Sequence, residues 1–209
     1  MRLHGWVIAS AVLLLLLAGC QDCGSAHGDP AAPPEASQNN GSLYAACNMR
    51  PSALLPEDLP KVHGHVLFKQ DHPQGGLSAL LQLGGFLSDG EPTAVHIHQY
   101  GDLSQGCGST GGHYNPHGKN HPNHPGDFGN FEPQEGKVDA AVESNATLFG
   151  ATSVIGRAVV VHEKRDDLGQ GGDAGSLLHG NAGRRLACCV IGISSSDLWN
   201  TSKEFTERG

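Results

Sequence analysis

The sequence predicts an all-β protein, a barrel or a sandwich, on three observations. Short segments with β-branched or alternating apolar residues recur along the chain, and glycine-rich turns separate them. Glycine is abundant, with 30 residues, whereas aromatic residues make up only 5% and apolar residues 38% of the chain. That balance suits many short strands better than long helices, and 209 residues allow about one domain with appendages.

The chain opens with a segment typical of a secretory signal peptide. Arg2 precedes an apolar run over residues 6–18 that is too short to span a bilayer comfortably. We expect a signal over residues 1–20, cleavage between 19 and 27, and a secreted, extracellular mature protein with no membrane span. A single membrane anchor is one alternative. Another is a bacterial lipoprotein, because Leu17-Ala18-Gly19-Cys20 resembles a lipoprotein box in which Cys20 carries the lipid.

Residues 21–60 are rich in proline and small polar residues, which predicts an N-terminal arm or linker. Within it, Leu43 to Met49 is more apolar, and is either a short helix or a contact with a partner. The main domain is then expected over residues 61–196, followed by a short polar tail over residues 197–209.

Strand signals begin at Val62. The expected strands are Val62–Phe68, Leu77–Leu83, Thr93–Gln99, Lys137–Glu143, Ile155–His162 and Arg185–Ile193. Two long, polar, glycine-rich stretches, Gly101–Glu132 and Glu163–Gly183, interrupt this pattern. Loops of that length inside a compact domain are usually functional.

Cysteine use and charge restrict the environment and the partners. Six cysteines fit an oxidising compartment, and Cys47, Cys107, Cys188 and Cys189 belong to the mature domain. Sequons at Asn40, Asn145 and Asn200 are candidates for glycosylation, with Asn145 favoured because it lies in a polar stretch between expected strands. A net charge of −8 with no basic run argues against binding to nucleic acid.

The most informative pattern is a set of six histidines and one aspartate at fixed intervals: His96-x-His98, His113, His121-x-x-His124-x-x-Asp127 and His162. Alternate residues of a strand share a face, so His96 and His98 can reach one ion, and His162 ends another strand. The other four residues lie eight, three and three positions apart in the first long loop. Three imidazoles and a carboxylate suit a structural zinc site, and a set of imidazoles with an open position suits Cu(II).

The chain has 13 histidines, so some of them are not ligands. His63-x-His65 has the same strand spacing as His96-x-His98, but no further ligand type lies close to it in the sequence. We expect it, together with His4, His27, His72 and His117, to be structural or exposed.

Several ordered motifs resemble those of the copper/zinc superoxide dismutase family, over roughly residues 60–195. They are Ala94-Val95-His96-Ile97-His98-Gln99-Tyr100-Gly101-Asp102, Gly112-His113-Tyr114-Asn115-Pro116, His124-Pro125-Gly126-Asp127-Phe128-Gly129-Asn130, Gly156-Arg157-Ala158-Val159-Val160-Val161-His162 and Gly180-Asn181-Ala182-Gly183-Arg184-Arg185-Leu186-Ala187-Cys188. The signal, the arm with Cys47 and the doubled Cys188-Cys189 are most similar to extracellular members of the family.

The resemblance implies an eight-stranded Greek-key β-barrel with two long functional loops, and one copper and one zinc per subunit. It implies copper on His96, His98, His113 and His162, and zinc on His113, His121, His124 and Asp127, so that His113 bridges the two metals. It further implies that Asp166 joins a ligand of each metal, that Cys107 pairs with Cys188, and that Cys47 is left for Cys189.

The activity implied is conversion of superoxide to oxygen and hydrogen peroxide. Copper would alternate between Cu(II) and Cu(I), Arg185 would dock the anion, and His113 would supply a proton. Homodimers or tetramers are expected. The alternatives are a secreted metal-binding protein without turnover and a copper-chaperone-type domain. Arg185 argues against the first, because a metal buffer needs no arginine to dock an anion.

The sequence also departs from the family. The segment Asp173-Ala174-Gly175-Ser176-Leu177-Leu178-His179 replaces guiding acidic residues and lysine. His179 stands where many relatives have a threonine, and we expect it to tune anion access. No basic, heparin-binding tail is expected, since residues 197–209 mix both charges.

Overall fold

The computed structural model describes residues 32–88 and 90–206. The expected signal peptide, its cleavage region and Cys20 lie outside the described residues. The strands are β1 (Leu43–Pro51), β2 (His63–Gln70), β3 (Leu77–Gly84), β4 (Thr93–His98), β5 (Ser104–Cys107), β6 (Asp127–Phe131), β7 (Lys137–Ser144), β8 (Ala158–His162), β9 (Arg185–Val190) and β10 (Gly192–Ile193). The helices are α1 (Pro34–Gln38), the 3-10 turn η1 (Gly108–Thr110), α2 (Ala174–His179) and α3 (Asp197–Thr206).

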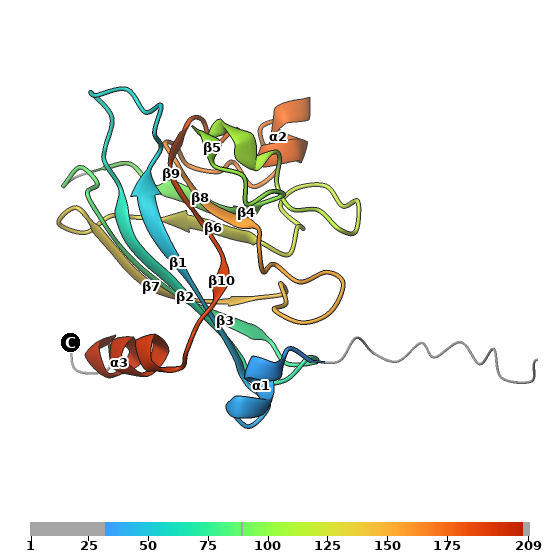
Figure 1. Ribbon diagram of the computed structural model, residues 1–209. Coiled ribbons are helices and arrows are strands. Elements are labelled where there is room, and N and C mark those ends of the chain that lie inside the picture. Colours follow the sequence, from blue (N-terminus) through green and yellow to red (C-terminus); the bar gives the residue numbers. More distant parts are fainter. Residues whose placement is uncertain (1–31, 89, 207–209) are drawn as a thin grey trace, which may run out of the picture.

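The strands confirm the all-β prediction. Eight of them follow one another in the hydrogen-bonded order β6-β4-β8-β9-β1-β2-β3-β7, every neighbouring pair is antiparallel, and β10 adds to β1. The two ends of this path, β6 and β7, lie near each other, so the sheet curls into a nearly closed barrel (Figure 1). Side chains that alternate along the strands fill its interior, among them Phe68, Leu81 and Val159.

The six expected strands are all present, within a few residues at their ends. The first long stretch also contains β5, η1 and β6, and the second contains α2. Both stretches lie with α2 at one end of the barrel, whereas α1 and α3 lie at the other end (Figure 1).

The N-terminal part of the barrel differs from the expectation of an arm over residues 21–60. Leu43–Pro51 forms β1, which pairs with β2 over seven positions and continues onto β9. Leu43 and Ala45 face the core, while Tyr44 is buried on the outer side of the sheet. Because both faces are covered, this strand lacks the apolar–polar alternation by which a strand is recognised.

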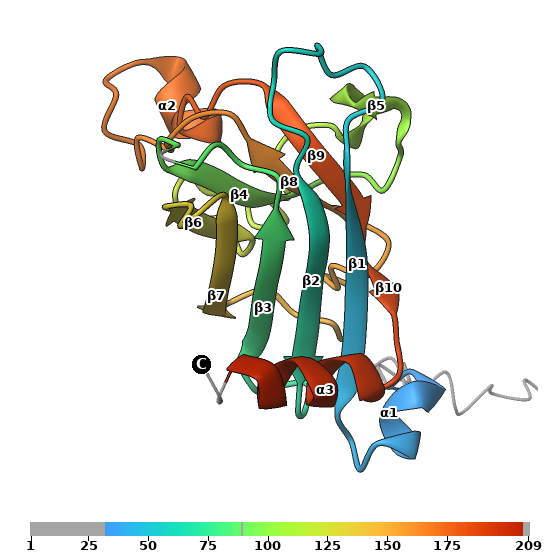
Figure 2. The same cartoon turned by 90° about the vertical axis from the view of Figure 1, so that its left-hand side faces the viewer.

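The expected polar tail contains α3. Trp199 from α3 is only 8% exposed, because it packs on Tyr44, Leu67 and Leu80, which project outward from three adjacent strands. Figure 2 shows this helix lying across β1, β2 and β3. In the described part of the chain, we find no helix with the length and apolar character that a membrane span requires.

Candidate metal centre

Three of the candidate ligands come from two paired strands. In β4 every residue is buried: Val95 and Ile97 face the barrel core, so His96 and His98 face the opposite side, beneath the long loops. β4 pairs with β8, whose last residue is His162. Antiparallel pairing therefore brings the three imidazoles together.

The loops bring the other four candidates to the same place. His113 forms an isolated bridge with His98, and the next residue, Tyr114, donates its backbone N–H to Ile97 O at 2.8 Å. Asp127 begins β6 and is paired with His96. The backbone N–H of His121 donates to Leu177 O at 3.0 Å, which joins the first loop to α2.

A first group of imidazoles consists of His96, His98, His113 and His162, whose ligand atoms all lie within 4.8 Å of one another. The outer nitrogens are occupied: His98 Nδ1 lies 2.9 Å from Gly111 O, His162 Nδ1 3.4 Å from Gly183 O, and His96 Nε2 2.8 Å from Asp166 Oδ2. A carbonyl or carboxylate oxygen accepts only from an N–H, so the inner nitrogen of each neutral ring carries a lone pair.

These lone pairs converge. His98 Nε2 and His162 Nε2 are only 3.1 Å apart, and His96 Nδ1 and His113 Nε2 are buried without a hydrogen-bond partner. Burial, with the neighbouring imidazoles, lowers the pKa of His98 and of His162 well below the ordinary value, so both rings are neutral. A cation accounts for facing lone pairs and buried, unpartnered nitrogens better than a proton does, and neutral imidazole suits copper.

A second group converges on the carboxylate of Asp127. His113 Nδ1 lies 3.1 Å from Oδ1, while His121 Nδ1 and His124 Nδ1 lie 2.9 and 3.1 Å from Oδ2. The far nitrogens are again engaged, His121 Nε2 by Asp166 Oδ1 at 2.7 Å and His124 Nε2 by Lys119 O at 3.0 Å. Three nitrogens and a carboxylate make a donor set of the structural zinc type.

Distance alone would give a different second group, because the ligand atoms of His96, His113, His121 and Asp127 all lie within 4.8 Å of one another. That set contains His96 in place of His124. We assign His124 to the second group, because Lys119 O fixes its tautomer and leaves Nδ1 facing the carboxylate. The Nε2 atom of His96 is already held by Asp166, and its free Nδ1 belongs to the first group.

The electrostatics differ between the two groups. Burial lowers the pKa of His113 to about 4, despite its contact with Asp127. Burial also opposes a charge on His121, but hydrogen bonds with Asp127 and Asp166 outweigh it and raise the pKa of His121 to about 9. Burial alone would raise the pKa of both carboxyls, whereas their imidazole donors hold the pKa of Asp127 and of Asp166 below the usual range.

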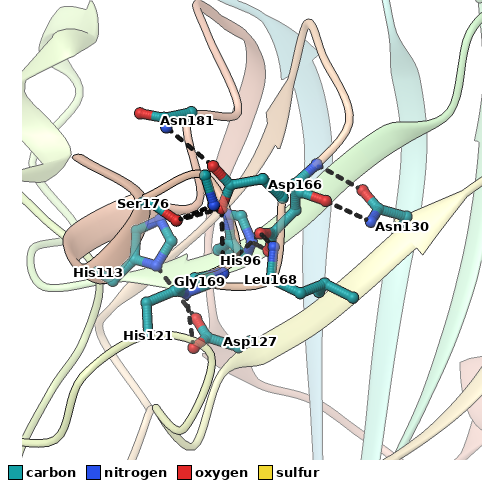
Figure 3. Close-up of polar contacts among 12 residues, drawn as sticks. His96, His113, His121, Asp127, Asn130, Asp166, Leu168, Gly169, Ser176 and Asn181 are labelled. Atoms are coloured by element: carbon teal, nitrogen blue, oxygen red, sulfur yellow. Dashed lines mark hydrogen bonds and ion pairs between the residues drawn. The ribbon is translucent and has the colours of Figure 1, made fainter. Parts of the chain in front are cut away.

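Asp166 connects the two groups, since its carboxylate accepts from His96 and from His121 (Figure 3). The side chain is buried, and Leu168 N donates to Oδ1 at 2.7 Å. Gly180 packs directly against this carboxylate with φ of 63°, so a Cβ there would collide with Asp166 Oδ1. The helix α2 therefore has to end at a glycine.

A cavity of about 780 Å³ opens onto the first group. Arg185 begins β9 and lies in the wall of this cavity, together with Lys119, Leu177, Leu178 and His179. Its Nη1 donates to Cys107 O at 2.8 Å and to Thr110 Oγ1 at 3.0 Å, and its Nη2 donates to Gly111 O at 2.7 Å. Burial lowers the pKa of Arg185, but a guanidinium is a strong enough base to remain charged near neutral pH. The loop thus fixes a cation beside the imidazoles.

Both implied disulfides are formed. Cys107 pairs with Cys188 at a Cα–Cα distance of 5.7 Å, and Cys47 pairs with Cys189 at 5.4 Å. Adjacent residues of β9 point to opposite faces, so Cys189 reaches β1 through the core while Cys188 holds β5 on the outer side.

The other residues considered in the sequence analysis lie outside the two groups of candidate ligands. His63 and His65 are exposed on β2, and His117 is exposed in the long loop. His179 lines the cavity, and its effect on anion access stays a prediction. Arg184 forms an exposed ion pair with Glu163, Nη2 to Oε1, at 2.7 Å. The roles of Asn115, Asn130 and the carbonyl of Lys119 were not predicted, because amides and backbone atoms carry no ligand signature in a sequence.

In comparisons with known proteins, the family model and the similar proteins described below are all copper/zinc superoxide dismutases. The family model of copper/zinc superoxide dismutase matches residues 62–191. The extracellular superoxide dismutase [Cu-Zn] of Rattus norvegicus is 51% identical over 170 residues, which cover 79% of this chain and 70% of the relative. The corresponding protein of Homo sapiens is 49% identical over 174 residues, 81% of this chain and 72% of the relative. The superoxide dismutase [Cu-Zn] of Podospora anserina is 45% identical over 143 residues, 65% of this chain and 92% of the relative.

Proposed function

The chain belongs to the copper/zinc superoxide dismutase family, and from that premise we propose which residues carry its activity. It is a secreted, extracellular antioxidant enzyme that converts two superoxide anions and two protons to oxygen and hydrogen peroxide. In our proposal copper binds His96, His98, His113 and His162. Zinc binds His113, His121, His124 and Asp127.

The observation that carries this assignment is the direction of the free nitrogens. Every candidate imidazole except His113 donates its outer N–H to an oxygen, and its other nitrogen points inward. His113 has both nitrogens inside the cluster, with Nδ1 near Asp127 and a buried, unpartnered Nε2. This is the arrangement that a ligand shared by two metals requires.

The residues have separate tasks. When bound, copper supplies a one-electron couple and zinc supplies a fixed positive charge. Arg185 attracts and orients the anion, since its guanidinium is fixed by loop oxygens at the wall of the cavity. In our proposal His113 Nε2, which is buried without a hydrogen-bond partner beside the cavity, is the atom that would hold the proton passed to the reduced anion. Asp166 and Lys119 O keep His96, His121 and His124 oriented.

The test is superoxide decay after pulse radiolysis, with one copper and one zinc loaded per chain. We expect fast decay that is lost on removal of copper and falls about tenfold to a hundredfold in Arg185→Ala, because an oriented cation for the reacting anion is removed. Arg184→Ala is the matched control, since Arg184 is paired with Glu163 at the surface. No decay with both metals bound would show a metal-binding protein without turnover.

We also propose a homodimer. Tyr100 and Val190 are 52% and 38% exposed, although both are large and apolar, and Val190 packs against Gly101 next to Tyr100. Such exposed patches mark protein contacts, and a second copy offers the same apolar patch. Light scattering after gel filtration should give twice the chain mass for the unmodified protein and one chain mass for Val190→Asp. A monomeric unmodified protein at micromolar concentration would contradict this assembly.

The exposed positions of Asn40, Asn145 and Asn200 support their use as glycosylation sites in a secreted protein. Enzymatic removal of N-linked glycans should lower the mass of the secreted protein, and Asn145→Gln should remove part of that difference. An unchanged mass after treatment would exclude all three sites.

A further inference from the structure

Two asparagines beside the candidate ligands make the same contact: each side-chain amide bonds to the backbone N–H and C=O of a single residue. Asn130, in β6, donates from Nδ2 to Asp166 O at 2.9 Å and accepts from Asp166 N at Oδ1, at 2.7 Å (Figure 3). One amide thus contacts both backbone polar groups of one residue 36 positions away. Two short hydrogen bonds from one planar group fix the position and the rotation of that backbone.

Asn115 repeats the pattern within the first long loop. Its Nδ2 donates to Lys119 O at 2.7 Å, and its Oδ1 accepts from Lys119 N at 2.9 Å. Lys119 lies outside every strand and helix of the described chain, so no ladder holds its backbone. The amide of Asn115 takes over that role.

The two residues that are held have different tasks. Asp166 accepts from His96 and from His121, and so orients one proposed copper ligand and one proposed zinc ligand. Lys119 O accepts from His124 Nε2, and so orients one zinc ligand alone. A shift of either acceptor would rotate the imidazoles that depend on it, because the outer hydrogen bond of a ligating histidine sets its tautomer and ring direction.

We propose that Asn130 and Asn115 are positioning residues that act on different sets of ligands. Asn130 orients ligands of both metals through Asp166, whereas Asn115 orients only a zinc ligand through the carbonyl of Lys119. The inference rests on the ligand set proposed above. The new element is that two amides, neither of which contacts a ligand, affect different metal sites.

The experiment compares Asn130→Ala, Asn115→Ala and Asn123→Ala in protein loaded with both metals. Asn123 is the matched control, because its amide lies in the same loop and donates to Asn120 O at 3.1 Å but holds no acceptor of a ligand. Three readouts are taken: the EPR spectrum of Cu(II), the visible spectrum of Co(II) placed in the zinc site, and metal retention against a chelator.

We expect Asn115→Ala to lose about tenfold in zinc affinity, near the lower end of the effect of outer-shell partners, and to change the Co(II) spectrum while the copper EPR spectrum stays as in the unmodified protein. Asn130→Ala should change both spectra. Asn123→Ala should change neither. If Asn115→Ala and Asn130→Ala change the same spectra to the same degree, or change none, the proposal is overturned.

The Asn→Asp variants separate positioning from a failure to fold. Each keeps the oxygen that accepts the backbone N–H and loses the donor to the carbonyl, so half of the contact remains. We expect an intermediate loss of affinity with the same division between metals. If the unmodified protein binds neither metal, the proposed ligand set fails; if it binds both and the variants match it, only the role of the asparagines fails.

Discussion

At the scale of single residues, hydrogen bonds on the outside of the group of candidate ligands hold the imidazole rings in orientations that suit metal binding. The outer nitrogens of His98 and His124 donate to backbone carbonyls, and those of His96 and His121 donate to Asp166. For His96, His98 and His124 each contact selects the tautomer whose lone pair faces inward. His121 also carries a proton on its inner nitrogen below its pKa of about 9, but its ring is already in place. The cost is a group of buried nitrogens without partners, which is unfavourable until a cation is bound.

Metal uptake by this prepared site should release a proton that belongs to His121. With no metal bound, the pKa of His121 is raised to about 9, so its stabilising charge is fully present below the ordinary value of 6.5 and is lost as the pH rises through 9. A metal needs the neutral ring. We therefore expect zinc affinity to increase as the pH rises from 6.5 to 9.

Calorimetry in two buffers of different ionisation enthalpy measures this proton directly. Near pH 7.5 it should show about one proton released per zinc from His121. The His98 and His162 rings are already neutral there, because burial lowers their pKa, so they add no proton when copper binds. Zinc binding with no pH dependence across this range would contradict the raised pKa.

At the scale of elements, β9 carries one cysteine of each disulfide and Arg185, the residue proposed to dock the anion, on six residues. The alternation of the strand sends Cys189 into the core and Cys188 to the outer face. Only the outer disulfide is linked to the cavity, because Arg185 donates to the carbonyl of Cys107. We therefore expect the two bonds to differ in function although they are neighbours in sequence.

Removing each disulfide by a pair of Cys→Ala changes should separate stability from activity. The bonds span 142 and 81 residues, and chain entropy predicts a loss of about 4–5 kcal/mol in the free energy of unfolding for either. Thermal unfolding measures that loss. Below the unfolding temperature we expect the Cys47/Cys189 variant to keep its turnover and the Cys107/Cys188 variant to lose much of it. Equal turnover in both variants would rule out a link from Cys107 to Arg185.

The helix α3 should act on stability alone. Trp199→Ala removes the side chain that covers Tyr44, Leu67 and Leu80, and we expect a loss of about 3 kcal/mol in unfolding free energy. Turnover should not change, because α3 lies at the end of the barrel opposite α2 and the long loops that carry candidate ligands (Figure 1). Leu198→Ala is the control, as Leu198 is 49% exposed. Equal unfolding temperatures for the two variants would mean that α3 is not held in place.

The elements also show how far the sequence could predict this structure. A strand with one exposed face, such as β7, was predictable from alternation and turns. The strand β1 was not, because α3 covers its outer face and removes the alternation. β6 was missed because Asp127 and Asn130 belong to the site and Gly129 carries no side chain, which leaves few apolar residues.

For the site, the spacing of histidines and the resemblance to a family named every candidate ligand. The contacts that orient those ligands were not predictable. Asn115 and Asn130 bond to backbone atoms, which any residue offers, and Lys119 acts through its carbonyl. Only the folded chain brings Asn130 to Asp166.

At the scale of the whole molecule, charge is distributed unevenly. The net charge is −8, yet the residues that line the metal cavity include Arg185 and Lys119 and no carboxylate. A local positive field in a net negative protein can draw an anion to the cleft, and superoxide dismutases are a known example of such steering. The segment that precedes Arg185 contributes Leu177 and Leu178 to the wall. Lys119 thus adds a second positively charged side chain to the cavity wall.

Lys119→Gln should therefore slow the capture of superoxide. We expect about a threefold fall in the association rate at low ionic strength, a small part of the total effect that steering can have, and little effect at high salt, where charges are screened. Ligand positions should not change, because His124 is held by the backbone carbonyl of Lys119. Lys137→Gln is the control: it lowers the net charge by the same amount but lines a different cavity. If both variants slow capture equally, only the net charge matters, and Lys119 has no local role.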